Sequence, residues 1–141
     1  MAFRNTIRDL VRTYQAFDAS SSSHIRSFCL TPSQFDVLVT LGNQSEMTVK
    51  ELTANTLITK GTMTGVLQRL EKKGLIERRV NEIDGRSQFI KISPKGQVLF
   101  ERIFPDHMNY FKVAFDKLTE QELMDLSALL QSLKRALETS R

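Results

Sequence analysis

Small, hydroxyl-bearing and basic side chains are concentrated in the stretch TKGTMTGVLQRLEKKG, residues 59–74. The second half of this stretch favours a helix. The first half opposes one, because it holds two glycines and three threonines, and each interior glycine costs a helix about 1 kcal/mol relative to alanine. Glycine permits close approach to another surface, whereas threonine, lysine and glutamine side chains bind phosphates or base edges. The residue types therefore indicate hydrogen-bonding chemistry toward nucleic acid.

A helix over residues 59–73 would separate these side chains from an apolar face made by Met63, Val66, Leu67 and Leu70. We expect Thr59 to be its N-cap and Gly74 to end it. For the two glycines the alternative is close packing against another helix, and for Lys72 and Lys73 it is a solvated helix end that complements the dipole. The candidate contact residues on this helix are Thr59, Lys60, Gly61, Thr62, Thr64, Gly65, Gln68, Arg69 and Lys72.

The elements that must position this helix have clear starting signals. Thr31, Thr48 and Thr119 are each followed three residues later by glutamine or glutamate, which is the pattern of a capping box. These signals predict helices over about 32–42, 48–55 and 120–138. Apolar residues at helical spacing predict an earlier helix that begins near Phe3, and the serine run within 18–23 is expected to end it in a short loop.

After Gly74 the apolar period changes to two, which predicts strands over 75–80 and 88–93. Asp84-Gly85 is a strong turn dipeptide between them. Arg86 follows this turn, where it can enter a narrow minor groove of enhanced negative potential, and we expect Asp84 to orient its guanidinium. Of two neighbouring arginines in the first strand, we expect Arg79 to reach phosphate while the other braces the hairpin.

A further helix is expected to begin at Pro94, and Pro105 should kink or interrupt it. The fold class is therefore mainly α with a small β-hairpin. Two helices, 48–55 and 59–73, joined by a tight turn and followed by a hairpin form a winged helix-turn-helix pattern, in which the second helix enters the major groove. Residues 60–95 hold nine basic and four acidic residues, a balance of +5, while the whole chain is +4. Phosphate neutralisation needs such a local excess.

The run ELTANTLITKGTMTGVLQRLEKKGLIERRVNEIDGRSQFIKISPKG resembles the MarR family of bacterial regulators. The matching features are LEKKGLIERR, the wing-tip DGR, and SPKG where the family usually has T-x-x-G. The resemblance implies a winged helix-turn-helix unit over 30–103, flanked by dimerisation helices over 1–29 and 104–141 that interleave in a homodimer. The leucine-rich segment 123–137 fits that assignment, because it holds more leucines than one helix needs to cover a small core.

The resemblance also implies a transcriptional regulator, commonly a repressor, on a palindromic DNA operator. Helix 59–73 would lie in the major groove and the wing, residues 81–87, in the minor groove. Many members of the family release DNA on binding a small aromatic or phenolic ligand, and others sense oxidants with a cysteine. Neither the effector nor its binding residues follow from the sequence.

Two alternatives stay open: a winged-helix module that binds protein, and a redox-sensing regulator that uses Cys29. A lone cysteine between Phe28 and Leu30 is usually buried and inert, and the family's peroxide sensors carry theirs earlier, in the first helix. The sequence has no catalytic triad, phosphate-binding glycine loop or paired carboxylates that would indicate an enzyme. His24 and His107 are far apart and lack a ligand cluster, so we expect no metal and no cofactor.

The bulk properties agree with this assignment. Forty per cent of the 141 residues are hydrophobic, which suffices for the core of one ordinary domain. There is no apolar run of about 18 residues that would span a membrane and no secretory signal. A single cysteine fits a reducing compartment. We therefore expect a cytoplasmic protein.

Overall fold

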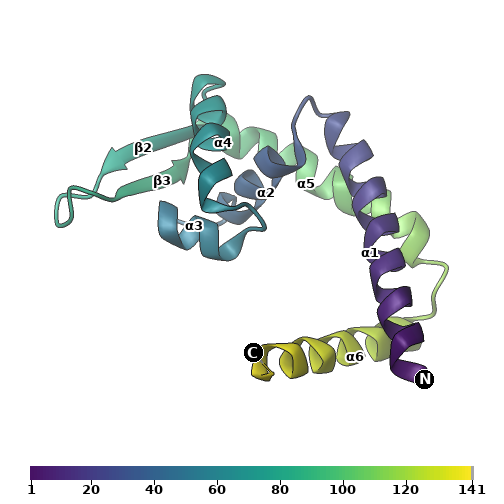
Figure 1. Cartoon of the computed structure of the whole chain (residues 1–141). Helices are drawn as coiled ribbons and strands as arrows, with labels where there is room; N and C mark the ends of the chain where they lie inside the picture. Colours follow the sequence, from purple (N-terminus) through teal and green to yellow (C-terminus); the bar gives the residue numbers. More distant parts are fainter. Residues whose placement is uncertain (141) are drawn as a thin grey trace. The chain divides into compact units, whose positions relative to one another are not determined.

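The computed structural model describes residues 1–140 (Figure 1). The chain divides into two compact units, and the boundary lies after Pro105. The elements of the first unit are α1 (Ala2–Arg26), α2 (Pro32–Leu41), β1 (Met47–Thr48), α3 (Val49–Asn55), α4 (Lys60–Lys72), β2 (Ile76–Val80), β3 (Gln88–Ile92) and the first half of α5 (Pro94–Phe115). The second unit contains the rest of α5 and α6 (Glu120–Thr139).

Helices α2, α3 and α6 begin at the three predicted capping boxes. In each, a threonine hydroxyl accepts a hydrogen bond from the backbone N–H three residues later, over 3.1–3.2 Å at Thr31, Thr48 and Thr119. The glutamine or glutamate at that later position accepts from the threonine N–H in return. Each box satisfies two backbone donors that a helix N-terminus otherwise leaves open. All three predicted helix starts are confirmed.

The core of the first unit is aliphatic and centres on α2 and α4. Four residues of α4, namely Met63, Val66, Leu67 and Leu70, are buried, as the apolar spacing predicts. They share one cluster with side chains from α2, α3, the sheet and α5, including Val37, Leu38, Leu41, Leu52, Ile76, Ile90 and Ile103. Full burial of an aliphatic side chain contributes about 1.5–3 kcal/mol. The apolar face of α4 is therefore fixed against the core, which leaves the opposite face to solvent.

The small sheet is antiparallel, with the strand order β1-β3-β2. Strands β2 and β3 confirm the predicted hairpin, with Ile76 opposite Ile92 and Val80 opposite Gln88. Strand β1 was not predicted, because two residues are too few to show an alternating pattern. Val80, at the end of β2, is 58% exposed, since the outer half of the hairpin extends beyond the core.

The serine run does not end the first helix, so that prediction is wrong. Helix α1 continues through Asp18–Ser23 and ends at Arg26. Serine disfavours a helix by only a few tenths of a kcal/mol per residue, and burial of Ile25 holds the last turn of α1 against the core. Tertiary packing thus outweighs the local preference of the serines.

Pro105 does not interrupt α5, which is assigned as one helix from Pro94 to Phe115. The expected interruption is therefore wrong. The boundary between the two compact units nevertheless falls directly after this residue. A proline inside a helix removes one backbone hydrogen bond, so the helix is locally weakened at the place where the two units meet in the sequence.

Three glycines are required by the fold of the first unit. A Cβ added at Gly96 would lie 2.1 Å from the carbonyl oxygen of Leu75, and one at Gly42 would lie 2.5 Å from the ring of Phe100. Gly74 has a φ of 77°, the left-handed conformation that commonly ends a helix. The prediction that Gly74 ends α4 is confirmed.

Large apolar side chains remain exposed on α1 and α6. Helix α6 has no buried residue. Its exposed apolar residues are Met124, Leu126, Leu129, Leu130 and Leu137, and those of α1 are Phe3, Ile7, Leu10, Val11, Tyr14 and Phe17. None of the helices in the described part of the chain is long and apolar enough to cross a membrane.

Candidate nucleic-acid interface

The turn between α3 and α4 is tied to α2. The carboxylate of Asp36 on α2 accepts a 3.1 Å hydrogen bond from the backbone N–H of Leu57, and Ile58 beside it is buried. Burial raises the pKa of Asp36, and the Leu57 hydrogen bond partly opposes that rise. The start of α4 is therefore held in place by a side chain that comes from the core helix.

The end of α4 is held by two lysines. The Lys73 ammonium donates to the carbonyl oxygen of Cys29 over 3.1 Å and to Oε1 of Gln34 over 3.2 Å. The Lys95 ammonium donates to the carbonyl oxygen of Lys73 over 2.9 Å. The sequence suggested that Lys73 is either a solvated charge or a phosphate ligand. In the structure Lys73 instead joins the end of α4 to α2 and to the turn before it.

The predicted contact residues of α4 share its outer face. Lys60, Thr64, Gln68 and Lys72 are all exposed, and their spacing of four places them along one stripe of the helix. Of the remaining candidates, Thr59, Gly61, Thr62 and Arg69 are exposed and Gly65 is half-buried. The structure thus leaves none of the nine predicted residues of this helix and its N-cap in the core.

Gly61 and Gly65 are not required by packing within the chain. A Cβ added at Gly61 meets nothing within 4 Å, and one at Gly65 meets only Nη1 of Arg69, at an ordinary contact distance of 3.8 Å. This contrasts with Gly42 and Gly96, where a Cβ would clash. Within the described residues the alternative of close helix packing is therefore excluded, and the two glycines leave no side chain at their positions on α4.

Thr59 has the backbone conformation of an N-cap, but its side chain does not cap α4. The predicted capping bond is absent because the Thr59 hydroxyl donates to the Thr62 hydroxyl over 3.0 Å. Residue 62 is a threonine, whereas the three capping boxes have glutamine or glutamate at this position. The first N–H groups of α4 therefore lack a side-chain acceptor, and such groups at the positive end of a helix favour phosphate.

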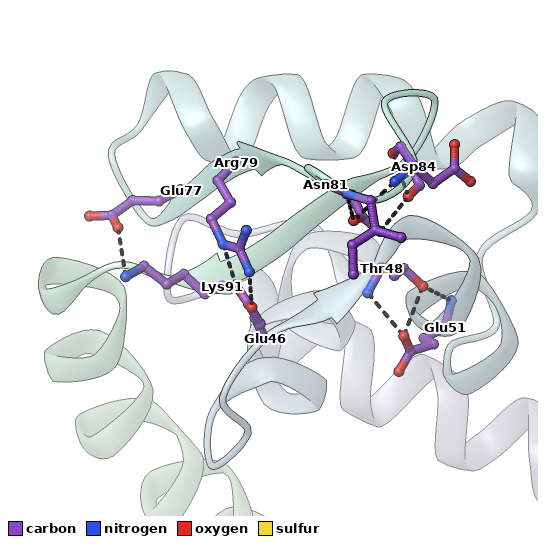
Figure 2. Close-up of polar contacts among 10 residues, drawn as sticks. Glu46, Thr48, Glu51, Glu77, Arg79, Asn81, Asp84 and Lys91 are labelled. Carbon is purple, nitrogen blue, oxygen red and sulfur yellow. Dashed lines mark hydrogen bonds and ion pairs between the residues drawn. The ribbon is translucent and has the colours of Figure 1, made fainter.

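The wing loop, residues 81–87, is held by its own polar side chains (Figure 2). Oδ1 of Asn81 accepts from the backbone N–H groups of Ile83 (3.0 Å) and Asp84 (3.3 Å), and its Nδ2 donates to the Ser87 hydroxyl (3.0 Å). Short Asn and Asp side chains commonly bond to backbone two residues on. The loop is thus a defined turn.

Asp84 does not orient the guanidinium of Arg86, so this part of the sequence prediction is corrected. Its Oδ1 accepts instead from the backbone N–H of Arg86 over 3.1 Å, because a carboxylate two residues earlier reaches the main chain more easily than the end of a long side chain. The Arg86 side chain is exposed and forms no ion pair within residues 1–140. Asp84 therefore shapes the turn from which Arg86 projects.

The guanidinium of Arg79 is exposed, but it is bonded within the chain rather than left free for phosphate. Its Nε donates to Oε2 of Glu46 over 3.1 Å, and Nη2 pairs with the other oxygen of that carboxylate (Figure 2). The guanidinium also lies 4.6 Å from the centre of the Phe89 ring. The Arg79 hydrogen bond lowers the pKa of Glu46, and the reciprocal bond raises the pKa of Arg79. This pair braces the base of the wing.

Arg78 braces the same hairpin from its other face. Its Nη1 donates to Oε1 of Gln88 on β3 over 3.3 Å, and its Nε lies 3.5 Å from the carboxylate of Glu71 on α4. Arg78 thereby links the hairpin to α4. Both arginines of β2 are structural in the free chain, whereas the sequence suggested that one of them reaches DNA.

The nine basic residues between 60 and 95 fall into two groups. Five bond to other parts of the chain: Lys73, Arg78, Arg79, Lys91 and Lys95. The other four, Lys60, Arg69, Lys72 and Arg86, are exposed and form no ion pair with any described residue. Three of these four lie on α4 and the fourth on the wing loop, so the basic side chains of this segment that bond to no other part of the described chain lie on the two predicted contact elements.

Three positioning residues were missed by sequence reasoning. Asp36, Glu46 and Asn81 hold, respectively, the start of α4, the base of the wing and the wing loop. Asn81 carried a usable signal, since asparagine next to an Asp-Gly turn often bonds to local backbone. Asp36 and Glu46 bond to residues more than 20 positions away in the sequence, and no short sequence pattern predicts such pairs.

Cys29 is exposed, whereas the sequence suggested a buried, inert thiol. It occupies a left-handed backbone position, with φ of 61°, in the turn that follows α1. Exposure removes one objection to the redox alternative. Among the described residues, no group of three or more histidine, cysteine or acidic side chains is placed to hold a metal ion.

Comparison with known proteins decides the family. A model of the MarR family matches residues 30–88, which include α2, α3, α4, β2 and the wing loop. The chain is 30% identical to the HTH-type transcriptional regulator MhqR of Bacillus subtilis (strain 168) over 122 residues, which are 86% of this chain and 84% of the relative. The chain belongs to the MarR family.

Solved structures agree with this membership. BpsR of Bordetella bronchiseptica is 27% identical, with a TM-score of 0.79 and coverage of 90% of this chain and 91% of the other. AbsC, a MarR family transcriptional regulator from Streptomyces coelicolor, shares the fold, with a TM-score of 0.84 at 21% identity and coverage of 96% and 94%. This MarR-family chain is a DNA-binding transcription regulator and not an enzyme, and its fold is the predicted winged helix.

Proposed function

We propose that this regulator binds a palindromic DNA operator as a homodimer, with α4 in the major groove and the wing loop in the minor groove. The observation that carries the proposal is the division of the basic residues. The side chains of Lys60, Arg69, Lys72 and Arg86 form neither a hydrogen bond nor an ion pair with the described chain, and they lie on the two elements that would face DNA. The other five basic residues of 60–95 are held by carboxylate, carbonyl or amide oxygens of the chain, so they are less available to neutralise phosphates than these four.

The contacts divide by role. Lys60, Arg69 and Lys72 neutralise phosphates, as do the uncapped N–H groups at the start of α4. Thr64 and Gln68, on the exposed stripe, reach base edges, where glutamine pairs with adenine and a threonine methyl contacts thymine. Gly61 and Gly65 let the backbone approach the groove. Arg86 enters the minor groove from the wing loop.

Dimerisation is supported by the apolar surface of α1 and α6. Helix α6 buries none of its side chains within the described chain, although leucines are among the residues that water excludes most strongly. We propose that segments 1–29 and 104–141 bury these faces against a second copy. A two-fold dimer presents the two α4 helices to half-sites about one DNA turn apart, roughly 34–36 Å.

Regulation by a small aromatic or phenolic ligand is supported by one solved relative. The structure of BpsR concerns regulation of its DNA binding by 6-hydroxynicotinic acid. We propose that a ligand of this class binds a form of the dimer that fits DNA poorly and so releases the operator, since a ligand shifts an equilibrium only through its different affinity for the two forms. Occupancy of the operator would then repress transcription in the cytoplasm.

The proposal is tested with duplexes that the protein selects from a random-sequence pool. We expect the selected sequences to contain an inverted repeat, and binding to weaken steeply with salt. Addition of 6-hydroxynicotinic acid or simple phenols should release the probe in a mobility-shift assay. If selected and scrambled duplexes bind equally, specific regulation fails. If binding is absent altogether, the protein-interaction alternative takes its place.

A further inference from the structure

A large apolar side chain stands fully exposed at the tip of the wing. Ile83 is 100% exposed. In Figure 1 the β2–β3 hairpin projects away from α2, α3 and α4, and the loop that carries Ile83 forms its far end. Full exposure of an isoleucine in a projecting loop has no structural benefit in the free chain, since isoleucine gains free energy only when it is removed from water.

The backbone around Ile83 is already held in one conformation. Its N–H and that of Asp84 both donate to Oδ1 of Asn81, and the Asn81 N–H donates to the Ser87 carbonyl oxygen over 3.2 Å, closing the loop. A contact made by a pre-ordered side chain loses little conformational entropy on binding. Ile83 is therefore presented as a contact rather than left on a flexible chain.

Charge alone does not favour entry of this loop into DNA. Within residues 81–87, Glu82 and Asp84 are acidic and Arg86 is basic, so the loop sums to −1. Asp84 is partly satisfied by the Arg86 backbone N–H, but both carboxylates still oppose approach to phosphates. An additional, non-electrostatic contact is needed to offset this repulsion.

We infer that Ile83 is a specificity-determining contact to the DNA minor groove. Its side chain packs against sugar and base surface beside Arg86 and favours an easily unstacked pyrimidine–purine step under each wing. Isoleucine is one of the apolar side chains that proteins insert at base steps in the minor groove, and TA and CA steps deform most readily. The inference rests on the proposed placement of the wing.

An apolar contact differs from a phosphate contact in two measurable ways. It releases no counterions, so its loss leaves the salt dependence of binding unchanged. It also makes affinity depend on the deformability of one step rather than on a hydrogen-bonding pattern. Arg86 should show the opposite behaviour, with a smaller salt slope when it is removed.

The test uses the full-length protein and duplexes that it selects from a random pool. The variants are I83A, I83L and the matched control V98A, an exposed aliphatic residue (69%) on α5, outside the wing. We expect I83A to bind about tenfold more weakly at an unchanged salt slope, I83L to restore most of the affinity, and V98A to bind like the wild type. Replacing TA by GC under the wing should weaken the wild type several-fold and I83A hardly at all.

Failure of this inference is distinguishable from failure of the proposed function. If the wild type selects a repeat and I83A binds it equally well, Ile83 makes no DNA contact and the inference is overturned. The same conclusion follows if I83A changes only the oligomeric state, or if V98A has the same effect as I83A. If the wild type selects no sequence at all, the operator proposal falls first, and with it the basis of this inference.

Discussion

The carboxylate of Asp36 accepts a hydrogen bond from the backbone N–H of Leu57, 21 residues later in the chain, over 3.1 Å. This bond joins the core helix α2 to the turn that starts α4. The acceptor is a partly buried carboxylate, although a neutral amide oxygen could accept the same hydrogen bond. Burial raises the pKa of this carboxylate. The pair thus positions the DNA-facing helix at a cost in charge desolvation.

We predict that D36A lowers the free energy of unfolding by about 1 kcal/mol, because the Leu57 N–H loses its acceptor. D36N keeps an amide oxygen at the same place and removes the charge, so at neutral pH it should be at least as stable as the wild type. Urea unfolding measures both variants. A D36N variant as unstable as D36A would show that the charge itself is required.

The pH dependence of the same comparison has a defined sign. The folded pKa of Asp36 lies above its ordinary value of 3.8, so the folded protein binds this proton more tightly than the unfolded chain does. Stability from this group therefore falls as pH rises from 3.8 through the folded pKa. The advantage of D36N over the wild type should grow across that window and then level off, and an advantage that shrinks with rising pH would contradict the assignment.

The stability that Glu46 contributes should depend on pH with the opposite sign to that of Asp36. Arg79 holds the pKa of Glu46 below the ordinary value of 4.5, so its contribution is present above pH 4.5 and is lost as pH falls through the folded pKa. We predict that E46Q is less stable than the wild type at neutral pH and that the difference disappears in acid. The measurement is urea unfolding at a series of pH values. A difference that does not shrink as pH falls below 4.5 would mean that the pair is not electrostatic.

Gly65→Ala and Gly61→Ala should stabilise the free protein by up to about 1 kcal/mol each, because the added Cβ meets open space or an ordinary contact. Both should weaken operator binding, since the methyl group stands between α4 and the groove. Thermal unfolding and mobility shifts measure the two effects. Gly96→Ala is the control and should destabilise the fold, because its Cβ would lie 2.1 Å from the Leu75 carbonyl oxygen. Unchanged operator binding by both α4 variants would place DNA elsewhere.

Lys72 and Lys91 allow a comparison between a lysine without a carboxylate partner and one that forms an ion pair. Lys72 forms no ion pair within the described chain, whereas the Lys91 ammonium lies 3.5 Å from the carboxylate of Glu77. We predict that K72A weakens operator binding and lowers the slope of log affinity against log salt by about 1, while K91A changes the slope little. Equal slopes for the two variants would show that only net charge matters.

Most of the fold could be predicted from local patterns. Capping boxes, apolar spacing and the Asp-Gly turn gave α2, α3, α4, α6 and the hairpin, because each of these signals lies within a few residues of its effect. The continuation of α1 through its serines could not be predicted, since it depends on the burial of Ile25 against distant residues.

In the candidate site, too, the features set by local sequence could be predicted and those set by distant contacts could not. The exposed face of α4 follows from the helical period and could be predicted. The engagement of Arg79 by Glu46 and the support of Leu57 by Asp36 could not, because each joins segments that only the folded chain brings together. Thr59 is instructive: its residue type predicted a cap, but the threonine at position 62 offered a competing hydroxyl.

The central claim is that α4 and the wing loop are the surface that binds DNA, and footprinting on the selected duplex tests it most directly. Hydroxyl-radical cleavage of the complex should show two protected regions about one DNA turn apart, roughly 34–36 Å, flanked by protected minor-groove segments. R86A should weaken the flanking protection and keep the two regions protected by α4. Protection without two-fold symmetry, or flanks that are as strongly protected in R86A as in the wild type, would contradict the account.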